Sequence, residues 1–373
     1  MRKICFVTTS PLIVNFFLVP HLLRLGRRYE VSLAVTLPGE VPLRPLPGVD
    51  IIAVDIRRQI DPLHDASAWF RLRRLYRERA FDLVHSFGPK AGLLSASAGR
   101  MAGTRARVHT FTGQVWAARS GAMRALLRAA DGATARMATH LLADSASQRD
   151  FLVQEGVAKP GQCRVLGMGS VSGVDLRRFR PDAAARRAVR SELGLNEETP
   201  MILYLGRITR DKGVLDLALA FGQVEGSAVL AMVGPDEQGL RDEVLRLSAA
   251  AAPRLRFVDY TDVPERYLAA ADLLCLPSHR EGFGSVVIEA AAAGVPAVAS
   301  RIYGVVDALV EGETGLLFEP GDARGLARQL SVLLTDRALR EKLGAAARSR
   351  AVEHFSQDAA LRALENLYEE ILG

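Results

Sequence analysis

Cysteine is scarce in this chain of 373 residues. The three cysteines, Cys5, Cys163 and Cys275, stand far apart in apolar surroundings, and no two have the Cys-x-x-Cys spacing of zinc and redox sites. We therefore interpret them as small core residues. Histidine, cysteine and carboxylate residues nowhere cluster at the spacing of metal ligands, so the sequence predicts neither a metal site nor a cofactor.

Long hydrophobic runs are also missing. The longest apolar stretches, residues 13–19 and 286–293, fall far short of the roughly 20 residues that a membrane-spanning helix needs. The first ten residues, MRKICFVTTS, are typical of a buried strand and not of a cleavable signal peptide. The sequence thus favours a cytoplasmic protein.

A chain of this length exceeds the size at which one core keeps growing, so two domains are expected. Short apolar segments typical of strands alternate with helix-like segments, which predicts α/β domains with doubly wound parallel sheets. The expected strands are residues 4–8, 31–35, 50–54, 83–85, 107–110 and 140–143 in a first series, and 201–205, 228–233, 255–258, 272–276, 297–300 and 314–318 in a second. Residues 166–181 are expected to link the two series.

Two carboxylates eight positions apart mark the second series. Glu281 and Glu289 lie in SHREGFGSVVIEAAAAGVPAVAS, residues 278–300, where a Gly-Phe-Gly turn leads into a helix expected at 286–293. The backbone N–H groups of residues 283–286 are predicted to bind a phosphate at that helix start. Glu289, about two turns along, suits the two hydroxyls of a ribose because a carboxylate only accepts hydrogen bonds. For Glu281 a merely solvated position is an equal alternative.

Two cations share the loop after strand 201–205. Arg207 and Lys212 stand in YLGRITRDKG, residues 204–213, and supply a fork-shaped guanidinium and a point-charge ammonium. Together they suit a diphosphate. Solvated loop cations are the common alternative, but the carboxyl ends of strands in open α/β sheets are where ligands bind.

These motifs, together with EGETGLLFEPGD and SGVDLRRFRP, resemble retaining glycosyltransferase family 4, whose members have the GT-B fold with two Rossmann-like domains facing a central cleft. The resemblance covers nearly the whole chain. It implies an acceptor-binding domain at residues 1–170, a nucleotide-sugar-binding domain at 171–355, and a helix at 356–373 that crosses back to the first domain. The segments HSFGPKAGLLSASAGRMAGTRARVHTFTGQVW and LLADSASQRDFLVQEGV further resemble the branch that builds capsular, O-antigen and other lipid-linked bacterial glycans.

The resemblance also implies roles for individual residues. Glu281 would be catalytic beside the donor sugar, and Glu289 would bind the nucleotide ribose. The donor diphosphate would be held by Arg207, Lys212, Gly282, Phe283, Gly284, Ser285 and Val286.

The chain departs from the family pattern in two places. Many members have a Gly-Gly pair in the loop after the first strand. Residues 8–15 of this chain read TTSPLIVN and contain no glycine. The common family linker begins with Asn where this chain has Ser172, to which we assign no role. The first departure leaves the acceptor-side loop open.

The candidate site residues of the first domain have weaker support from the sequence. His109 ends an expected strand, at the place where the family often has a histidine that contacts the donor sugar, so it is a second catalytic candidate; a hydrogen-bonded structural histidine is the alternative. Asn15, Lys90 and Gln114 stand on segments expected to face the same cleft and are candidate acceptor contacts.

Positive charge is concentrated in the first half of a chain whose formal net charge is +6. One basic stretch interleaves with Trp116 and Met123, and a second with Trp69 and Phe70; such amphipathic surfaces indicate contact with the anionic inner face of a membrane. Solvated helix faces are the common alternative, and no nucleic-acid-binding module accompanies the charge. The cations are Arg100, Arg105, Arg107, Arg119, Arg124, Arg128 and Arg136 in the first stretch, and Arg57, Arg58, Arg71, Arg73, Arg74, Arg77 and Arg79 in the second.

The resemblance implies a retaining glycosyltransferase that moves a sugar, a HexNAc or related hexose, from a UDP-sugar to a lipid-diphosphate-linked saccharide in bacterial surface polysaccharide or glycan synthesis. The sequence lacks the Asp-x-Asp tripeptide that binds metal-diphosphate in the other large transferase fold, which favours metal independence. Two alternatives stay open: a nucleotide-sugar epimerase of related fold, and a non-catalytic nucleotide-sugar-binding protein that docks at a membrane.

Overall fold

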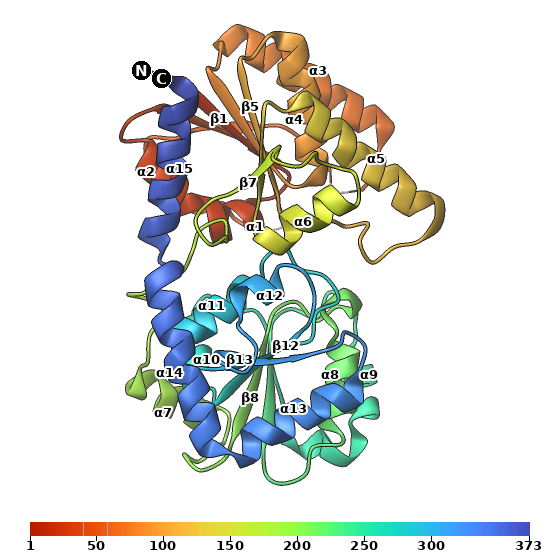
Figure 1. Cartoon of the computed structure of the whole chain (residues 1–373), viewed down its shortest axis with the longest axis vertical. Helices are drawn as coiled ribbons and strands as arrows, with labels where there is room; N and C mark the ends of the chain where they lie inside the picture. The colour runs from red at the N-terminus through yellow and green to blue at the C-terminus, as the bar shows by residue number, and fades with distance from the viewer. Residues whose placement is uncertain (40, 58) are drawn as a thin grey trace. The chain divides into compact units, whose positions relative to one another are not determined.

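The computed structural model describes residues 1–39, 41–57 and 59–373. The chain divides into two compact units (Figure 1). Unit 1 comprises Met1–Ser172 together with Asp358–Gly373, and unit 2 comprises Gly173–Gln357. The basic residue Arg58 lies outside the described residues.

In the described part of unit 1, seven strands form one parallel sheet in the order β3-β2-β1-β4-β5-β6-β7. Most strand residues are buried, as expected for a parallel sheet covered by helices on both faces. The strands are β1 (Lys3–Thr8), β2 (Glu30–Val35), β3 (Asp50–Ala53), β4 (Leu83–Phe87), β5 (Ala106–Phe111), β6 (His140–Ala143) and β7 (Cys163–Val165).

Helices cover both faces of this sheet. One apolar cluster joins it to the π-helix η1, α2 and α15, and another joins it to α3 and α4. The helical segments of unit 1 are α1 (Pro11–Ile13), η1 (Val14–Leu18), α2 (Val19–Leu25), α3 (Pro62–Arg79), α4 (Pro89–Ala102), α5 (Gly121–Met137), α6 (Ala146–Gln154) and α15 (Gln357–Leu372).

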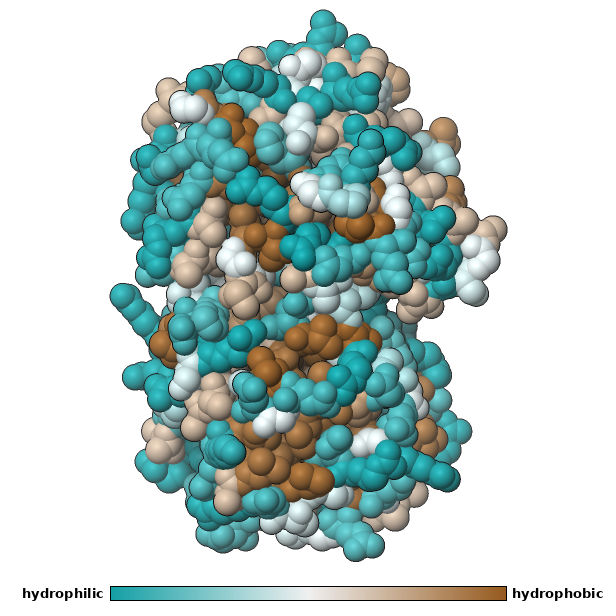
Figure 2. All heavy atoms as spheres, viewed as in Figure 1, coloured by the Kyte–Doolittle hydropathy of each residue, from teal (hydrophilic) through white to brown (hydrophobic). Residues whose placement is uncertain are grey.

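The surface drawn in Figure 2 is mostly hydrophilic, with hydrophobic side chains in separate areas on each unit. Among the helices of the described residues, none is both long and apolar enough to cross a bilayer.

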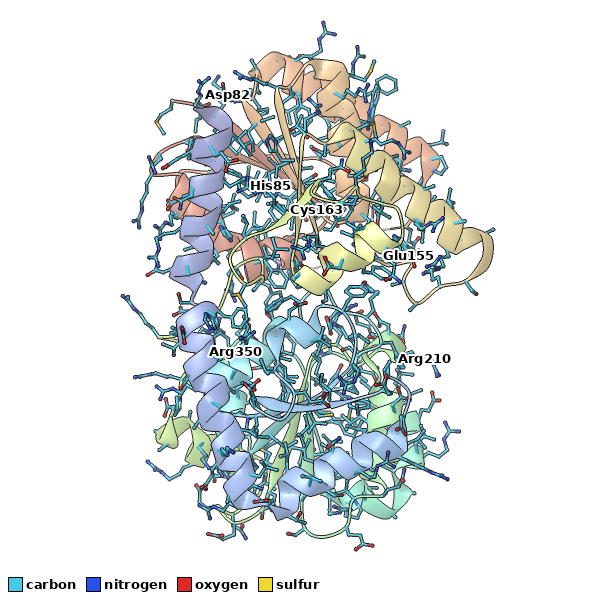
Figure 3. All side chains as sticks on the ribbon, viewed as in Figure 1. Asp82, His85, Glu155, Cys163, Arg210 and Arg350 are labelled. Atoms are coloured by element: carbon cyan, nitrogen blue, oxygen red, sulfur yellow. The ribbon has the colours of Figure 1, made fainter. Side chains whose placement is uncertain are left out.

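The last helix, α15, completes the core of unit 1. Leu364, Leu367 and Tyr368 are buried against residues of β1 and β4. The Tyr368 hydroxyl lies 2.6 Å from Nδ1 of the buried His85, the residue labelled in the first unit in Figure 3. The other ring nitrogen, Nε2, lies 2.7 Å from the Thr110 hydroxyl. Burial holds the pKa of His85 well below its usual range, so the ring is neutral and each nitrogen needs a different kind of partner.

Ion pairs fix α15 along its length. Arg24 contacts Glu365 at 2.7 Å and Asp358 at 3.2 Å, and Arg164 contacts Glu370 at 2.8 Å. Because most of these groups are exposed, we expect the buried contacts to contribute more to stability than the ion pairs.

In the described part of unit 2, six strands form a second parallel sheet in the order β10-β9-β8-β11-β12-β13. Helices α8, α9 and α13 pack on one face, and α7, α10, α11 and α14 on the other. The strands are β8 (Met201–Leu205), β9 (Val229–Val233), β10 (Leu255–Val258), β11 (Leu273–Leu276), β12 (Ala297–Ser300) and β13 (Gly315–Phe318). The helical segments are α7 (Ala183–Glu192), η2 (Arg210–Lys212), α8 (Val214–Phe221), α9 (Arg241–Leu247), η3 (Ala249–Arg254), α10 (Pro264–Ala270), α11 (Ser285–Ala292), α12 (Val305–Ala308), α13 (Ala323–Thr335) and α14 (Arg337–His354).

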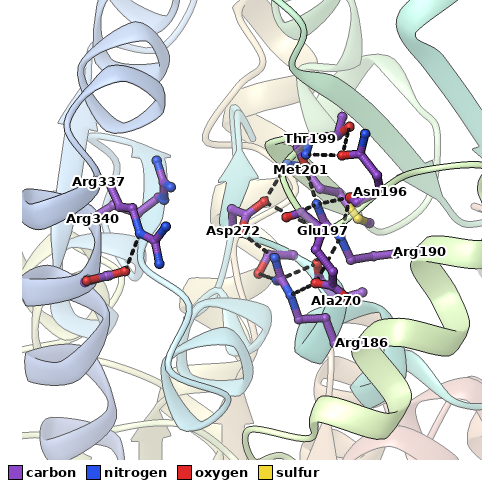
Figure 4. A network of polar contacts seen from close by, with 12 residues as sticks. Arg186, Arg190, Asn196, Glu197, Thr199, Met201, Ala270, Asp272, Arg337 and Arg340 are labelled. Atoms are coloured by element: carbon purple, nitrogen blue, oxygen red, sulfur yellow. Dashed lines mark hydrogen bonds and ion pairs between the residues drawn. The ribbon is translucent and has the colours of Figure 1, made fainter.

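A buried arginine ties the amino-terminal ends of β8 and β11 together (Figure 4). Arg190 of α7 is 1% exposed and donates to the carbonyl of Ala270 at 2.9 Å and to the carboxylate of Asp272 at 3.4 Å. Asp272 also accepts from Arg186 at 3.0 Å and from the backbone N–H of Met201 at 2.7 Å. The buried charge is therefore paired and hydrogen-bonded, as its burial requires.

Replacing Tyr368 by Phe is expected to destabilise unit 1 by about 1–3 kcal/mol, because the variant leaves a buried nitrogen of His85 without a partner. The change is measured by urea unfolding. Far-UV circular dichroism follows the transition, because its signal comes mainly from the backbone and not from the substituted tyrosine. The control is Tyr260→Phe in unit 2, whose exposed hydroxyl donates to Asp262, with an expected change within about 0.5 kcal/mol. Equal effects of the two substitutions would contradict the importance assigned to the His85 contact.

Candidate functional site

The candidate donor residues lie where the strand order of unit 2 reverses. Strands β8 and β11 are neighbours although two strands, β9 and β10, and their connecting helices lie between them in sequence. Ligands of open α/β sheets bind at such a point, outside the carboxyl ends of the strands. The loop after β8 carries Arg207 and Lys212, and the loop after β11 carries Glu281.

Lys212 and Glu281 form an ion pair, with 2.6 Å between Nζ and Oε1. The Ser278 hydroxyl also donates to this carboxylate oxygen, at 2.7 Å. Both charged side chains are mostly buried. The structure thus brings together a cation and a carboxylate that are 69 positions apart in the sequence.

Further contacts join the same two loops. Arg280 contacts Asp211 at 3.3 Å, and His279 contacts Asp216, in the first turn of α8, at 2.9 Å. Gly213 has φ +68° and a backbone so close to Pro277 that an added Cβ would lie 1.9 Å from the Pro277 oxygen. No side chain other than hydrogen fits there, so the two loops hold one relative position.

The helix after the Glu281 loop begins at Ser285, one residue before the predicted start. Gly284 caps it with φ 74° and ψ 51°, a left-handed conformation that favours glycine. The backbone N–H groups of the first turn point out of the helix end, where they favour an anion. The Phe283 side chain instead packs in the core, 5.4 Å from the ring of Phe355, so only its backbone is available to a phosphate.

Glu289 lies on α11 and is half-buried. Within the described residues its carboxylate makes no hydrogen bond or ion pair. Burial raises its pKa from 4.5 to about 7; the charge of Arg178 acts in the opposite direction, and that of Glu265 adds to the increase. A carboxylate held in this way has unused acceptor capacity for two hydroxyls.

Arg207 stands apart from the Lys212–Glu281 pair. Its guanidinium contacts Glu237 at 2.8 Å, and both side chains are well exposed. An exposed pair of this kind contributes little to stability, so Arg207 can exchange Glu237 for a ligand anion at small cost.

In unit 1, His109 is 1% exposed. Its Nδ1 lies 3.0 Å from the Ser86 hydroxyl, and the ring packs on Phe111 and against Gly92. Burial lowers the pKa of His109 to about 3, so the ring is neutral.

The three acceptor-side candidates each engage a different segment of unit 1. Asn15 bonds the carbonyl of Pro42 and the backbone N–H of Arg44, both at 2.9 Å. Lys90 pairs with Asp65 at 2.8 Å, and the buried Gln114 accepts from Gln148 at 3.4 Å. The contacts found among the described residues join none of the three to another.

The expectation that Trp116 forms an aromatic tip on a membrane-facing surface is wrong. Trp116 is fully buried: its ring stacks on Phe151, Arg124 covers it, and its Nε1 donates to Asp131 at 2.7 Å. The partner stands fifteen positions away on α5, so no local pattern marks it.

Sequence reasoning also missed Ser278, Asp211 and Arg280 as parts of the donor loops. All three stand inside the two quoted motifs, which is the signal that could have identified them. Among the residues that the structure describes, no group of three or more His, Cys, Asp or Glu side chains is arranged to hold a metal ion.

Two protein-family models match the chain, one in each unit. Residues 18–169 match the model of the glycosyl transferase 4-like domain, and residues 185–350 match that of glycosyl transferases group 1. The two models cover every strand of the two sheets except β1. The chain is a GT-B glycosyltransferase.

This glycosyltransferase is 28% identical over 323 residues to the capsular polysaccharide biosynthesis glycosyltransferase CapM of Staphylococcus aureus, a match that covers 86% of this chain and 84% of CapM. Two solved structures share its fold. Sucrose-phosphate synthase from Thermosynechococcus elongatus has a TM-score of 0.84 and 23% identity, covering 100% of this chain and 99% of that one. Anabaena HepE in complex with UDP and glucose has a TM-score of 0.83 and 20% identity, covering 99% of this chain and 100% of HepE.

Glu289→Gln is expected to gain stability relative to the wild type as pH rises from 5 to 8. The unfolded glutamate loses its proton near pH 4.5 and the folded one near pH 7, so ionisation penalises the folded wild type increasingly across this range and leaves the variant unaffected. Thermal unfolding at each pH measures the difference. The exposed Glu313→Gln serves as the control and should show a constant difference; a constant difference for Glu289→Gln would contradict the burial of its carboxylate.

Proposed function

We propose that unit 2 binds a UDP-sugar and that the protein transfers the sugar, a HexNAc or related hexose, with retention of configuration and without a metal ion. The observation that carries the proposal is the Lys212–Glu281 pair at the switch point. Glu281 lies on the loop that leads into α11, and α11 carries the unsatisfied carboxylate of Glu289. HepE, a protein of the same fold, was solved in complex with UDP and with UDP-glucose, which supports a uridine nucleotide.

The hard step is cleavage of the bond between the anomeric carbon and the diphosphate oxygen. Negative charge builds on the diphosphate as this bond breaks, and Lys212, Arg207 and the N–H groups at the start of α11 can stabilise it because they are already in place. Gly282, Phe283, Gly284, Ser285 and Val286 supply that backbone. Glu289 would hold the ribose.

In the proposed reaction the acceptor hydroxyl attacks the anomeric carbon from the face that the diphosphate leaves. The new bond joins the acceptor oxygen to the anomeric carbon, and the hydroxyl proton passes to the leaving phosphate oxygen, so no enzyme nucleophile is required. Glu281 would orient the donor sugar. His109, being neutral, would act through a hydrogen bond and not as a cationic acid.

The acceptor is proposed to be a saccharide on a lipid diphosphate, delivered at the inner face of the membrane. CapM, which takes part in capsular polysaccharide synthesis, supports this class. The amino-terminal half of α5 is exposed, with Met123 at 41% and Leu126 at 57%, and Arg119 is exposed beside it. Arg124 and Arg128 share one acid, Glu155, so the segment keeps net positive charge. Asn15, Lys90 and Gln114 remain candidate acceptor contacts.

Lys212→Met, Glu281→Gln and Glu289→Ala are each expected to lower kcat/KM for sugar transfer by about 100-fold or more, because each removes a charged contact to the donor. The assay combines UDP-sugars with a detergent-solubilised polyprenyl diphosphate-linked sugar in EDTA, and scores UDP release and product mass. Lys159→Met removes an exposed lysine and should be fully active.

Transfer that stops in EDTA would contradict metal independence. Epimerised nucleotide sugar formed without acceptor would favour the epimerase alternative, and nucleotide-sugar binding without turnover would favour a docking protein.

Met123→Glu combined with Leu126→Glu is expected to weaken binding to phosphatidylcholine–phosphatidylglycerol vesicles by about tenfold or more, because two apolar contacts are lost and two negative charges face an anionic surface. Vesicle sedimentation measures the binding. Val352→Glu in unit 2 replaces a comparably exposed apolar residue and should bind as the wild type does. Equal binding of all three proteins would exclude α5 from the membrane contact.

A further inference from the structure

The loops after β8 and β11 are joined by two ion pairs whose members are neighbours in the sequence. Nη2 of Arg280 lies 3.3 Å from Oδ2 of Asp211, and Nζ of Lys212 lies 2.6 Å from Oε1 of Glu281. An exchange of partners would place Arg280 against Lys212. It would also place Asp211 against Glu281, and like charges in close contact repel. The two pairs therefore favour one alignment of the two loops.

The partner of Arg280 is itself held in place. The Thr209 hydroxyl donates to Oδ1 of Asp211 at 2.6 Å, and the Asp211 carbonyl accepts from the backbone N–H of His279 at 3.0 Å. Arg280 is mostly buried, with 23% of its side chain exposed. Among the residues that the structure describes, its guanidinium has no other hydrogen-bond or ion-pair partner. The position of Arg280 is therefore set by Asp211.

Glu281 is anchored through one of its two carboxylate oxygens. Lys212 and the buried Ser278 hydroxyl both donate to Oε1, at 2.6 Å and 2.7 Å. Oε2 accepts no hydrogen bond from the described residues, so it is available to a ligand. Once a diphosphate engages Lys212, one of the two ion pairs between the loops is lost. The alignment of the carboxylate then depends on Ser278 and on the remaining pair of Arg280 with Asp211.

We propose that Arg280 and Asp211 are positioning residues of the donor site, whose ion pair keeps Glu281 aligned with the donor sugar after Lys212 has moved to the diphosphate. The inference rests on the roles proposed for Lys212 and Glu281. It gives the two ion pairs different tasks: the Lys212 pair exchanges its carboxylate for the ligand, and the Arg280 pair stays closed throughout the reaction.

Direct contact of Arg280 with the diphosphate is the competing interpretation, and the two interpretations predict different affinities for UDP. In a direct contact, loss of Arg280 weakens UDP binding, and loss of Asp211 strengthens it because the guanidinium is released. In the positioning role neither substitution changes UDP affinity. Lys212 and the start of α11 remain, and the close contact of Gly213 with Pro277 still holds the loops together.

The experiment compares UDP binding by calorimetry with sugar transfer in the assay described above. Arg280→Met and Asp211→Asn should each lower kcat about tenfold, because Glu281 is misplaced. Each should leave the Kd of UDP within about twofold of the wild type, since no contact to the diphosphate is removed. The double variant should lose no more activity than either single variant, because the two residues act as one unit. Arg280→Lys keeps the charge and should retain most of the activity.

Arg210→Met is the matched control. Arg210 stands beside Asp211 in the sequence, but its guanidinium pairs with Glu243 of α9 at 2.6 Å and not with the loop after β11. This variant should equal the wild type in both measurements. Thermal unfolding confirms that the compared proteins are folded, and Arg280→Gln takes the place of Arg280→Met if the latter does not fold.

The outcomes separate the inference from the function on which it rests. An unchanged kcat in the single variants, additive losses in the double variant, or a change in UDP affinity would overturn the positioning role and leave the donor site in place. If the wild type transfers no sugar, or if Lys212→Met and Glu281→Gln transfer it as fast as the wild type, the proposed function itself fails.

Discussion

The adjacency of β8 and β11 is the constraint on which the donor site depends. In a parallel sheet the carboxyl ends of all strands reach the same edge, and where the chain order reverses, two loops emerge side by side with no crossover helix between them. Here those loops are joined by the Lys212–Glu281 pair, by Arg280 with Asp211, and by the contact of Gly213 with Pro277. The opposing charges hold the two loops together without a ligand, so the proposed diphosphate would need little reorganisation to replace part of this network.

The Glu289 side chain lowers the stability of the folded protein. A carboxylate without a hydrogen-bond partner on a largely buried helix destabilises the folded protein, and its raised pKa expresses that cost. Natural proteins tolerate such local conflicts where function requires them. Two ribose hydroxyls would satisfy the same group, so on the proposed role ligand binding and folding stability would be linked through one side chain.

Much of the fold could be predicted from the sequence because parallel strands are continuous apolar runs. Strands β6, β8, β10 and β12 have the bounds that periodicity predicts. Strand β7 was missed because its three residues, Cys163–Val165, include an arginine and give no pattern. The donor motifs were recognisable as strand–loop–helix units, but the pairing of Lys212 with Glu281 is a contact between distant segments, which spacing cannot reveal. The burial of Trp116 depends likewise on Asp131 in another element.

The return of α15 to unit 1 has a consequence for how the chain is made. Synthesis proceeds from the amino terminus, so the seven strands of the first sheet leave the ribosome before unit 2, yet the side chains of Leu364, Leu367 and Tyr368 that close one face of that sheet emerge only after it. All of unit 2 is synthesised in the interval. The nascent first sheet therefore presents an uncovered apolar face, including Phe6 and the unpartnered His85, for the time needed to translate nearly two hundred residues, roughly ten to forty seconds. Apolar surface exposed for that long favours aggregation, which is the hazard that chaperones counter during translation.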